Sequence, residues 1–347
     1  MSKPVSVLYP ELMHYTNTAG LTGILASGCV WATHAAFLND AKEMKHFFDA
    51  RLLEISLPEA MKYIERLSSF SEWGNLIRIE GGIEKIAKLQ AEQQVAQIRS
   101  VSLTFNQPYI FSMSVAGTAQ ISSNGLLSQW RGYGGDGGYA LVLDTAEMEQ
   151  LLANEKMAFR YNFAEMGDVY YFDASCSNKP CPTNIAEAEE LVRIGIKALL
   201  HDQPSEAANG FYNAISSLSC SYKHSGFAEE REVRVVAIPF VPVAPPITWA
   251  DGALKPQKSI KLAFAAGDEI KLQKPIKTFV RNGTDVPYLE LFKNGGPPET
   301  QARLPIKKVI IGPHKDATSR AADIKQLLEK HGYNPEVVCS SIPYVTR

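Results

Sequence analysis

The stretch LMHYTNTAGLTGILASGCVWATHAAFLNDAKE, residues 12–43, constrains the fold most, because strand and helix signals alternate within it. A strand is expected at its start and a second one through residues 30–32. Between them, Asn17 or Thr18 can cap a short helix, and Gly28 can end that helix in a left-handed conformation. The stretch therefore predicts a βαβ-like unit at the start of the fold.

A second helix is expected after this unit, because Asp40-x-x-Glu43 has the spacing of a capping box and apolar residues follow it at helical intervals. The two helices thus carry a cluster of polar side chains at their ends: His14, Tyr15, Thr16, Asn39 and Asp40. Polar groups on rigid elements are typical of a ligand site. An ordinary N-terminal unit of this kind would have the same appearance.

The composition is that of an ordinary globular protein. Of 347 residues, 45% are hydrophobic and 21% are charged, which is enough apolar material for a sizeable core. The formal net charge of -2 does not favour nucleic acid as a partner, and no apolar run is long enough to cross a membrane. No signal peptide is recognised, and the five cysteines have no zinc-site spacing. We therefore expect a cytoplasmic protein with reduced thiols.

The rest of the chain mixes helices and strands without a break in composition. We expect one α+β domain over residues 1–347, with a helical insert at about residues 58–99. Residues 157–163 and 168–171 are predicted to form an antiparallel pair, and a polar loop is expected at residues 116–124. Other strands are expected at residues 108–115, 139–144, 231–239, 259–263, 276–280, 288–292, 306–311 and 336–340, and other helices at residues 145–152, 184–201, 206–222 and 318–331.

Gly132-x-Gly134-x-x-Gly137 has the spacing of the dinucleotide-binding fingerprint, but its surroundings do not fit. That fingerprint follows a strand and opens a helix, so that the helix N-terminus meets the pyrophosphate. Here a strand is expected to follow, at residues 139–144. We interpret the run as a flexible glycine hinge rather than a Rossmann site.

The charged stretch that ends in Glu230-Arg231-Glu232-Val233-Arg234 is the sharpest candidate for chemistry. Residues two apart share one face of a strand, so Glu230, Glu232 and Arg234 are expected to point the same way. One interpretation is a charge ladder on a solvated edge strand. The other is a carboxylate held beside a sugar hydroxyl and a developing positive charge.

Three further candidates have ordinary structural interpretations. A single histidine on an apolar strand, such as His14, is more often a hydrogen-bonded core residue than a catalyst. Trp130 and Tyr133 are more often packing anchors than ligand contacts. The sequence has no nucleophile elbow, P-loop or metalloprotease motif, so hydrolase, NTPase and metalloprotease functions have no positive support.

Taken in order, the motifs resemble a large bacterial family of uncharacterised proteins that is similar to the mono-ADP-ribosyltransferase superfamily. The motifs are HYT…LTGILASGCVWAT…FLNDAKE, SMS, LSQWRGYGGDGGYALVLD, FAEEREVRVV, RNGTDVPYLEL, LPIKKVIIGP and SSIPY, from about Leu12 to Tyr344. HYT resembles the first motif of His-type transferases, which include the DarT-like DNA-modifying toxins. Glu230-Arg231-Glu232 is similar to the Glu-x-Glu motif of arginine-modifying toxins, and Ser112-Met113-Ser114 is similar to their Ser-Thr-Ser strand. The resemblance implies an ADP-ribosyltransferase-like fold of split antiparallel or mixed sheets.

The resemblance also implies a role for each matched residue. His14 would bind the adenosine ribose of NAD, Glu232 would hold the nicotinamide-ribose hydroxyl, and Glu230 would assist the acceptor. Either glutamate could be the catalytic carboxylate. Trp130 or Tyr133 could stack on nicotinamide, and the pyrophosphate could meet Arg131, Arg234 or Arg281. The complete set expected to bind NAD is His14, Tyr15, Thr16, Asn39, Ser114, Trp130, Tyr133 and Arg234.

We therefore expect an NAD-dependent mono-ADP-ribosyltransferase that needs no metal and modifies an unknown macromolecular acceptor, either protein or nucleic acid. A toxin or phage-defence setting is implied by the resemblance alone. The alternatives are an NAD glycohydrolase on the same fold and a non-catalytic module that binds a nucleotide or a protein. A nucleic-acid-binding protein is a third possibility, which the even charge balance disfavours.

Overall fold

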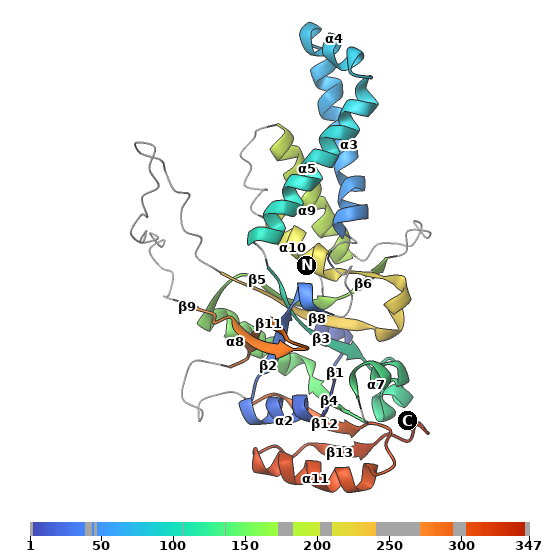
Figure 1. Cartoon of the computed structure of the whole chain (residues 1–347), viewed down its shortest axis with the longest axis vertical. Helices are drawn as coiled ribbons and strands as arrows, with labels where there is room; N and C mark the ends of the chain where they lie inside the picture. The colour runs from blue at the N-terminus through green and yellow to red at the C-terminus, as the bar shows by residue number, and fades with distance from the viewer. Residues whose placement is uncertain are drawn as a thin grey trace.

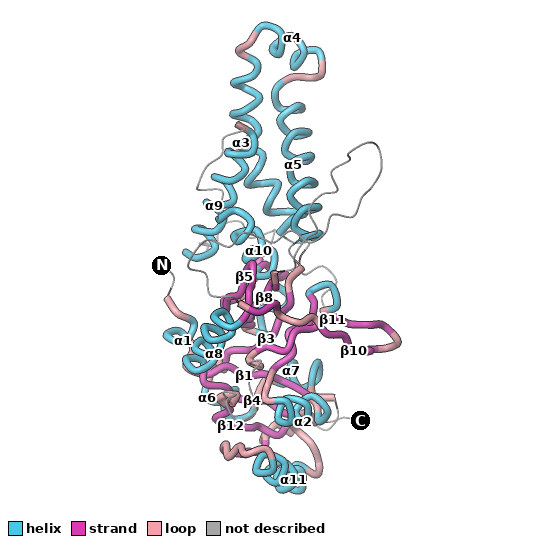
Figure 2. Tube along the Cα trace, turned by 90° about the vertical axis from the view of Figure 1, so that its left-hand side faces the viewer, coloured by secondary structure: helices cyan, strands magenta, loops and turns pink. Residues whose placement is uncertain are grey.

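The computed structural model describes residues 3–38, 44, 47–105, 107–135, 137–172, 183–201, 210–240, 271–293 and 303–343. Within these ranges the chain is a mixed α/β protein, as the sequence predicts at that level. Its centre is one eleven-stranded mixed sheet, accompanied by a separate two-stranded sheet. Helices lie around the main sheet, and a long helical hairpin projects from it (Figures 1 and 2).

The strands of the main sheet are β1 (Glu11–Thr16), β2 (Val30–His34), β3 (Tyr109–Val115), β4 (Tyr139–Asp144), β5 (Phe159–Asp168), β8 (Glu232–Pro239), β9 (Leu272–Gln273), β10 (Lys277–Arg281), β11 (Thr284–Leu291), β12 (Ile306–Ile311) and β13 (Glu336–Cys339). The small sheet pairs β6 (Tyr170–Phe172) with β7 (Tyr222–His224). The helices are α1 (Val5–Leu8), α2 (Thr18–Ser27), α3 (Leu52–Ser68), α4 (Ser71–Ile79), α5 (Ile83–Phe105), α6 (Ala119–Asn124), α7 (Leu127–Tyr133), α8 (Thr145–Ala158), α9 (Thr183–Leu200), α10 (Phe211–Ser221) and α11 (Ala317–Lys330), with short helical turns η1 (Ala35–Phe37), η2 (Phe47–Arg51) and η4 (Ser225–Glu230).

The opening unit folds as its local signals predict. The Asn17 side chain caps α2 by accepting a hydrogen bond from the backbone N–H of Gly20, and Gly28 ends the helix at a φ of 65°. β1 and β2 do not pair with each other, however, because each of them pairs with a different end of β3. The capping box predicted at residues 40–43 lies outside the described residues.

The main sheet divides at β3. On one edge, β8 pairs with β3 from Tyr109 to Ser114. On the other edge, β2 pairs only with Tyr109 and Ile110, whereas β1 pairs only with Ser114 and Val115. In the part of the sheet that is described, the middle of β3 thus has no strand partner on this second edge. β1 and β2 diverge there, and the opening between them is the place where a ligand can approach the sheet.

Side-chain alternation places the two faces of the sheet in different surroundings. Leu12 of β1 belongs to the main core, which contains buried residues of α2, α8 and α11. Its neighbours Met13 and Tyr15 belong to a smaller cluster with Trp130 of α7. The described helices thus cover both faces of the sheet (Figure 1), and α7 packs on the face that carries Met13 and Tyr15.

The helical insert spans α3, α4 and α5 and begins before the predicted residue 58. The turn η2 continues directly into α3, and Pro58 lies inside this helix without ending it. The hairpin has its own apolar cluster, which contains Ala60, Ile64 and Ala87. Among the described residues, no helix is long and apolar enough to cross a membrane.

Several other element predictions are confirmed and two are corrected. The last three elements form a β-α-β unit in which β12 and β13 are parallel, as predicted. The pair predicted at residues 157–163 and 168–171 is wrong, because β5 is one continuous strand that pairs with β8. β6 pairs in parallel with β7, and the predicted loop at residues 116–124 contains α6, which Thr118 caps. The strand predicted at residues 259–263 lies outside the described part of the chain.

Candidate functional site

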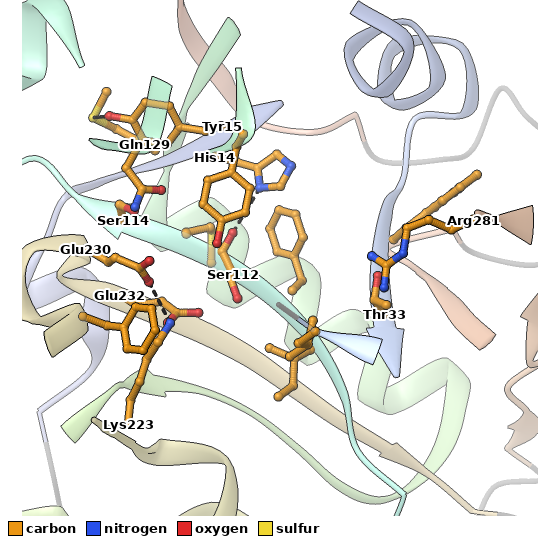
Figure 3. A pocket seen from close by; sticks show the side chains of 18 residues that line it. His14, Tyr15, Thr33, Ser112, Ser114, Gln129, Lys223, Glu230, Glu232 and Arg281 are labelled. Atoms are coloured by element: carbon orange, nitrogen blue, oxygen red, sulfur yellow. Dashed lines mark hydrogen bonds and ion pairs between the residues drawn. The ribbon is translucent and has the colours of Figure 1, made fainter. Parts of the chain in front are cut away.

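A pocket of about 280 Å³ opens where the sheet divides (Figure 3). Six strands (β1, β2, β3, β7, β8 and β10), helix α7 and the turns beside the strands contribute its walls. The lining residues are Met13, His14, Tyr15, Trp31, Thr33, Leu38, Ile110, Phe111, Ser112, Met113, Ser114, Gln129, Tyr133, Lys223, Phe227, Glu230, Glu232 and Arg281. The pocket thus brings together segments that lie more than two hundred positions apart in the chain.

His14 is fixed by the backbone of the divided sheet. Its Nδ1 lies 3.0 Å from the carbonyl oxygen of Ser112, in the part of β3 where β1 and β2 have diverged. A carbonyl oxygen can only accept, so Nδ1 carries the proton. Burial lowers the pKa of His14, which favours the neutral ring. In that tautomer Nε2 is a hydrogen-bond acceptor, and it is suited to a hydroxyl group of a ligand.

Glu232 is the most firmly held carboxylate of the pocket and is only 6% exposed. Arg234 grips both of its oxygens, with Nε 2.8 Å from Oε1 and Nη2 2.8 Å from Oε2. The Nζ of Lys223 is 2.8 Å from Oε2. Burial alone would raise the pKa of Glu232, but Arg234 and Lys223 together lower it to about 2. Glu232 is therefore an ionised carboxylate near neutral pH.

Lys223 joins Glu232 to Glu230. Its Nζ is 2.7 Å from Oε2 of Glu230 and lies 4.9 Å from the ring centroid of Phe227. Burial alone would lower the pKa of Lys223, but Glu232 and Glu230 raise it above its usual value. The ammonium group is consequently a fixed positive charge between two negative ones.

Glu230 reaches this cluster from a helical turn, not from the strand as predicted. The turn η4 ends at Glu230, and Arg231 has a φ of 44°, so β8 begins only at Glu232. Regular alternation therefore does not extend back to Glu230. The charge-ladder interpretation is also wrong, because β8 lies between β3 and β5 and all eight of its residues are buried.

Three of the residues expected to bind NAD line the pocket beside His14. Ser114 is the register partner of Glu232 across β3 and β8 and therefore lies next to it. Tyr133 is 40% exposed, so its ring has a face that a ligand can reach. Tyr15 also borders the pocket, but its hydroxyl accepts a hydrogen bond from the N–H of Leu126, and its ring contacts Trp130. Its side chain thus braces α7 against β1.

Three other expected residues do not line the pocket. Trp130 is 2% exposed and donates from Nε1 to the carbonyl oxygen of Asn124, so it is a packing residue of α7. Thr16 lies against Gly20 at the start of α2. Arg234 lies behind Glu232, where its Nη1 also donates to the carbonyl oxygen of Cys220. Asn39 lies outside the described residues.

The sequence reasoning missed several residues that line the pocket. Lys223 precedes the charged stretch, but no short pattern distinguishes it from a surface lysine. Trp31 alternates with core residues of β2 and remains 43% exposed, with its ring centroid 4.2 Å from that of Tyr288. Thr33 and Arg281 lie at the end of the pocket opposite Glu230 (Figure 3). Of the three arginines considered for the pyrophosphate, Arg281 is the one in the pocket lining.

In the described part of the chain, no group of three or more histidine, cysteine or acidic side chains is placed to hold a metal ion. Of the described cysteines, Cys29 and Cys339 are free thiols.

Comparison with protein families matches residues 129–235 to a family described as "Protein of unknown function (DUF2971)". The matched segment contains Tyr133 and the charged cluster from Lys223 to Arg234. The searches against curated proteins and against solved structures gave no match. The family match covers a minority of the chain and assigns no activity to it.

Proposed function

We propose that the pocket binds NAD and that the protein is a mono-ADP-ribosyltransferase with the corresponding split-sheet fold. The observation that carries the proposal is that His14 and Glu232 line one pocket although they lie more than two hundred positions apart in the sequence. One is a neutral imidazole with an acceptor nitrogen, and the other is an ionised carboxylate. Those are the two groups needed to hold a ribose hydroxyl and to stabilise a positive charge.

The pocket size suits part of a dinucleotide. Small-molecule sites typically enclose about 300–1,000 Å³, and the 280 Å³ here is just below that range. We therefore assign the enclosed volume to the ribose and base at the reacting end, with the remainder of NAD along the open mouth. Tyr133 is placed to stack on a base, and the guanidinium of Arg281 is suited to a phosphate.

The carboxylate of Glu232 would act electrostatically. A carboxylate has about four acceptor positions, and the hydrogen bonds from Arg234 and Lys223 occupy three of them. The remaining position, on Oε1, can accept a bond from a ribose hydroxyl. As the bond between ribose C1′ and the nicotinamide nitrogen breaks, its electron pair leaves with nicotinamide, and the fixed carboxylate stabilises the positive charge at the sugar.

The test is nicotinamide release from NAD by the full chain. We expect release by the wild-type protein, and a loss of about a hundredfold or more in Glu232→Gln, in the range observed when one electrostatic group of an active site is removed. His14→Ala should weaken NAD binding. Glu147→Gln is the matched control, because Glu147 is exposed on α8. Equal release by wild type and Glu232→Gln would refute the proposal.

A non-catalytic nucleotide-binding module is the second candidate, and one observation favours it. Arg234 and Lys223 together offset the negative charges of Glu232 and Glu230, which weakens the field available to stabilise a cation. Saturable NAD binding that depends on His14, without any nicotinamide release, would support this module and would exclude the transferase.

A further inference from the structure

Lys223 occupies a cation site formed by the protein itself. Its ammonium group bonds to Glu230 and Glu232 and lies over the ring of Phe227. Two carboxylates and an aromatic face are the groups that bind an organic cation best. Lys223 is 5% exposed, so its displacement would require a buried ammonium group to find new partners. The site is therefore filled from within the chain.

The remaining charges of the pocket also oppose a second cation. Among the described residues that line it, the charged side chains are Lys223, Arg281, Glu230 and Glu232. Their charges cancel, and Arg234 adds a positive charge directly behind Glu232. Both carboxylates already hold a cation. An incoming guanidinium or ammonium group would thus meet no described carboxylate that lacks a positive partner.

We propose that the acceptor of the ADP-ribosyl group is an uncharged nucleophile, such as a hydroxyl group, a ring nitrogen or water, and that Lys223 is the residue that rejects cationic acceptors. This inference rests on the proposed function. It concerns the acceptor class, although Lys223 also bonds to Glu232, the carboxylate assigned to the ribose hydroxyl.

The chemical step is balanced for an uncharged acceptor. The bond between ribose C1′ and nicotinamide breaks, and neutral nicotinamide leaves with the electron pair. A lone pair of the acceptor oxygen or nitrogen forms the new bond to C1′. The acceptor loses one proton, so that NAD and the acceptor give the ADP-ribosyl product, nicotinamide and a proton. Glu230 is the more exposed of the two carboxylates, with 18% of its side chain accessible, and it is the better placed to receive that proton.

The experiment gives the wild-type protein, together with NAD, two small acceptors that differ in charge. Agmatine presents a guanidinium group, and methanol presents a neutral hydroxyl group. Products are identified by mass spectrometry, and nicotinamide is measured in the same samples. We expect methyl ADP-ribose and no ADP-ribosylagmatine, with no inhibition of nicotinamide release by agmatine. ADP-ribosylagmatine formed by the wild type as readily as the methanol product would overturn the inference.

Variants assign the effect to Lys223. In Lys223→Met, the methylene stem remains and the cation site is vacated, so modification of agmatine should rise by about tenfold or more, the order expected when a cation gains a desolvated carboxylate partner. Lys223→Arg keeps a cation and should still reject agmatine. Lys62→Met is the matched control, since Lys62 pairs with Glu59 in the helical hairpin, away from the pocket.

The outcomes separate the two proposals. A folded Lys223→Met protein that releases nicotinamide but does not gain agmatine modification would overturn the role of Lys223. If that variant does not fold, the wild-type comparison of agmatine with methanol still decides the acceptor class. A protein that releases no nicotinamide in any reaction would refute the proposed function, and with it this inference.

Discussion

Replacing Glu232 with glutamine tests the electrostatics of the pocket without any ligand. Glutamine has nearly the same shape as glutamate but cannot ionise, so the substitution removes the charge that Arg234 and Lys223 surround. Those partners lower the pKa of Glu232 from its usual 4.5 to about 2, although burial alone would raise it. The folded protein therefore binds fewer protons at this site than the unfolded chain does between these two values.

The size and sign of the effect follow from that difference. At about 1.4 kcal/mol per pKa unit, the difference contributes on the order of 3 kcal/mol to the free energy of unfolding. This contribution is fully present above pH 4.5, where the carboxylate is ionised in both states. It is lost as the pH falls through about 2, and rather more than half of it, on the order of 2 kcal/mol, is lost by pH 3.

The assay is urea unfolding of the wild-type protein and Glu232→Gln at pH values from 7 to 3. The wild type should be the more stable protein at pH 7, and the difference between the two should shrink by about 2 kcal/mol on acidification to pH 3. Other acidic groups titrate in both proteins and cancel in the comparison. A difference that is constant over this range, or that grows on acidification, would refute the assignment of Glu232 as an ion-paired buried carboxylate.

Three further predictions concern stability and are checked by thermal or urea unfolding. Trp130→Phe should cost about 1 kcal/mol, because the hydrogen bond from Nε1 to the carbonyl oxygen of Asn124 is lost while the Ser340 hydroxyl still donates to that oxygen, and NAD binding should be unchanged because Trp130 lies outside the pocket lining. Glu155→Gln should cost about 3–5 kcal/mol, because it leaves the buried ammonium of Lys274 without its carboxylate, and adding Lys274→Met should recover part of that loss. Gly125→Ala should destabilise the protein, because φ is 73° there and an added Cβ would lie 2.5 Å from the Trp130 ring.

The sequence predicts elements best where the signals are local. The cap at Asn17 and the left-handed Gly28 lie at the two ends of one helix, and both are found as expected. The end of the chain behaves in the same way, since β12, α11 and β13 carry simple periodicity. Such patterns depend on neighbours a few positions apart, and tertiary packing did not override them.

The aromatic residues of α7 show where local reasoning fails. Trp130 and Tyr133 are three positions apart, and the sequence offers both as stacking partners for a base. In the structure Trp130 is 2% exposed and Tyr133 is 40% exposed. The difference arises because α7 packs on β1 through Trp130, whose ring meets Tyr15, and that contact depends on a strand more than a hundred positions away.

The charged cluster shows the same limit more strongly. Sequence spacing predicts that Glu230, Glu232 and Arg234 lie together on one strand. The spacing gives no indication that Lys223 bonds to both carboxylates. That contact requires β7 and η4 to fold back beside the first residue of β8. The positive φ of Arg231 also interrupts the strand that simple alternation assumes. The residue types were thus predictable, whereas their partners were not.

The divided edge of β3 explains why a polar pocket forms in an otherwise apolar sheet. A buried carbonyl without a strand partner must find another donor, and Ser112 finds it in the imidazole of His14. That bond holds the histidine at the opening and sets its tautomer, so the division of the sheet also determines which nitrogen of His14 faces a ligand.

The same bond bears on the interpretation of a loss of NAD binding in His14→Ala. In His14→Ala the Ser112 carbonyl would face a pocket that water can enter, and water can replace the lost donor. We therefore expect a change in stability of about 1 kcal/mol or less alongside a clear loss of NAD binding. A His14→Ala protein that unfolds outright would show that the histidine is a structural residue of the sheet and not a ligand group.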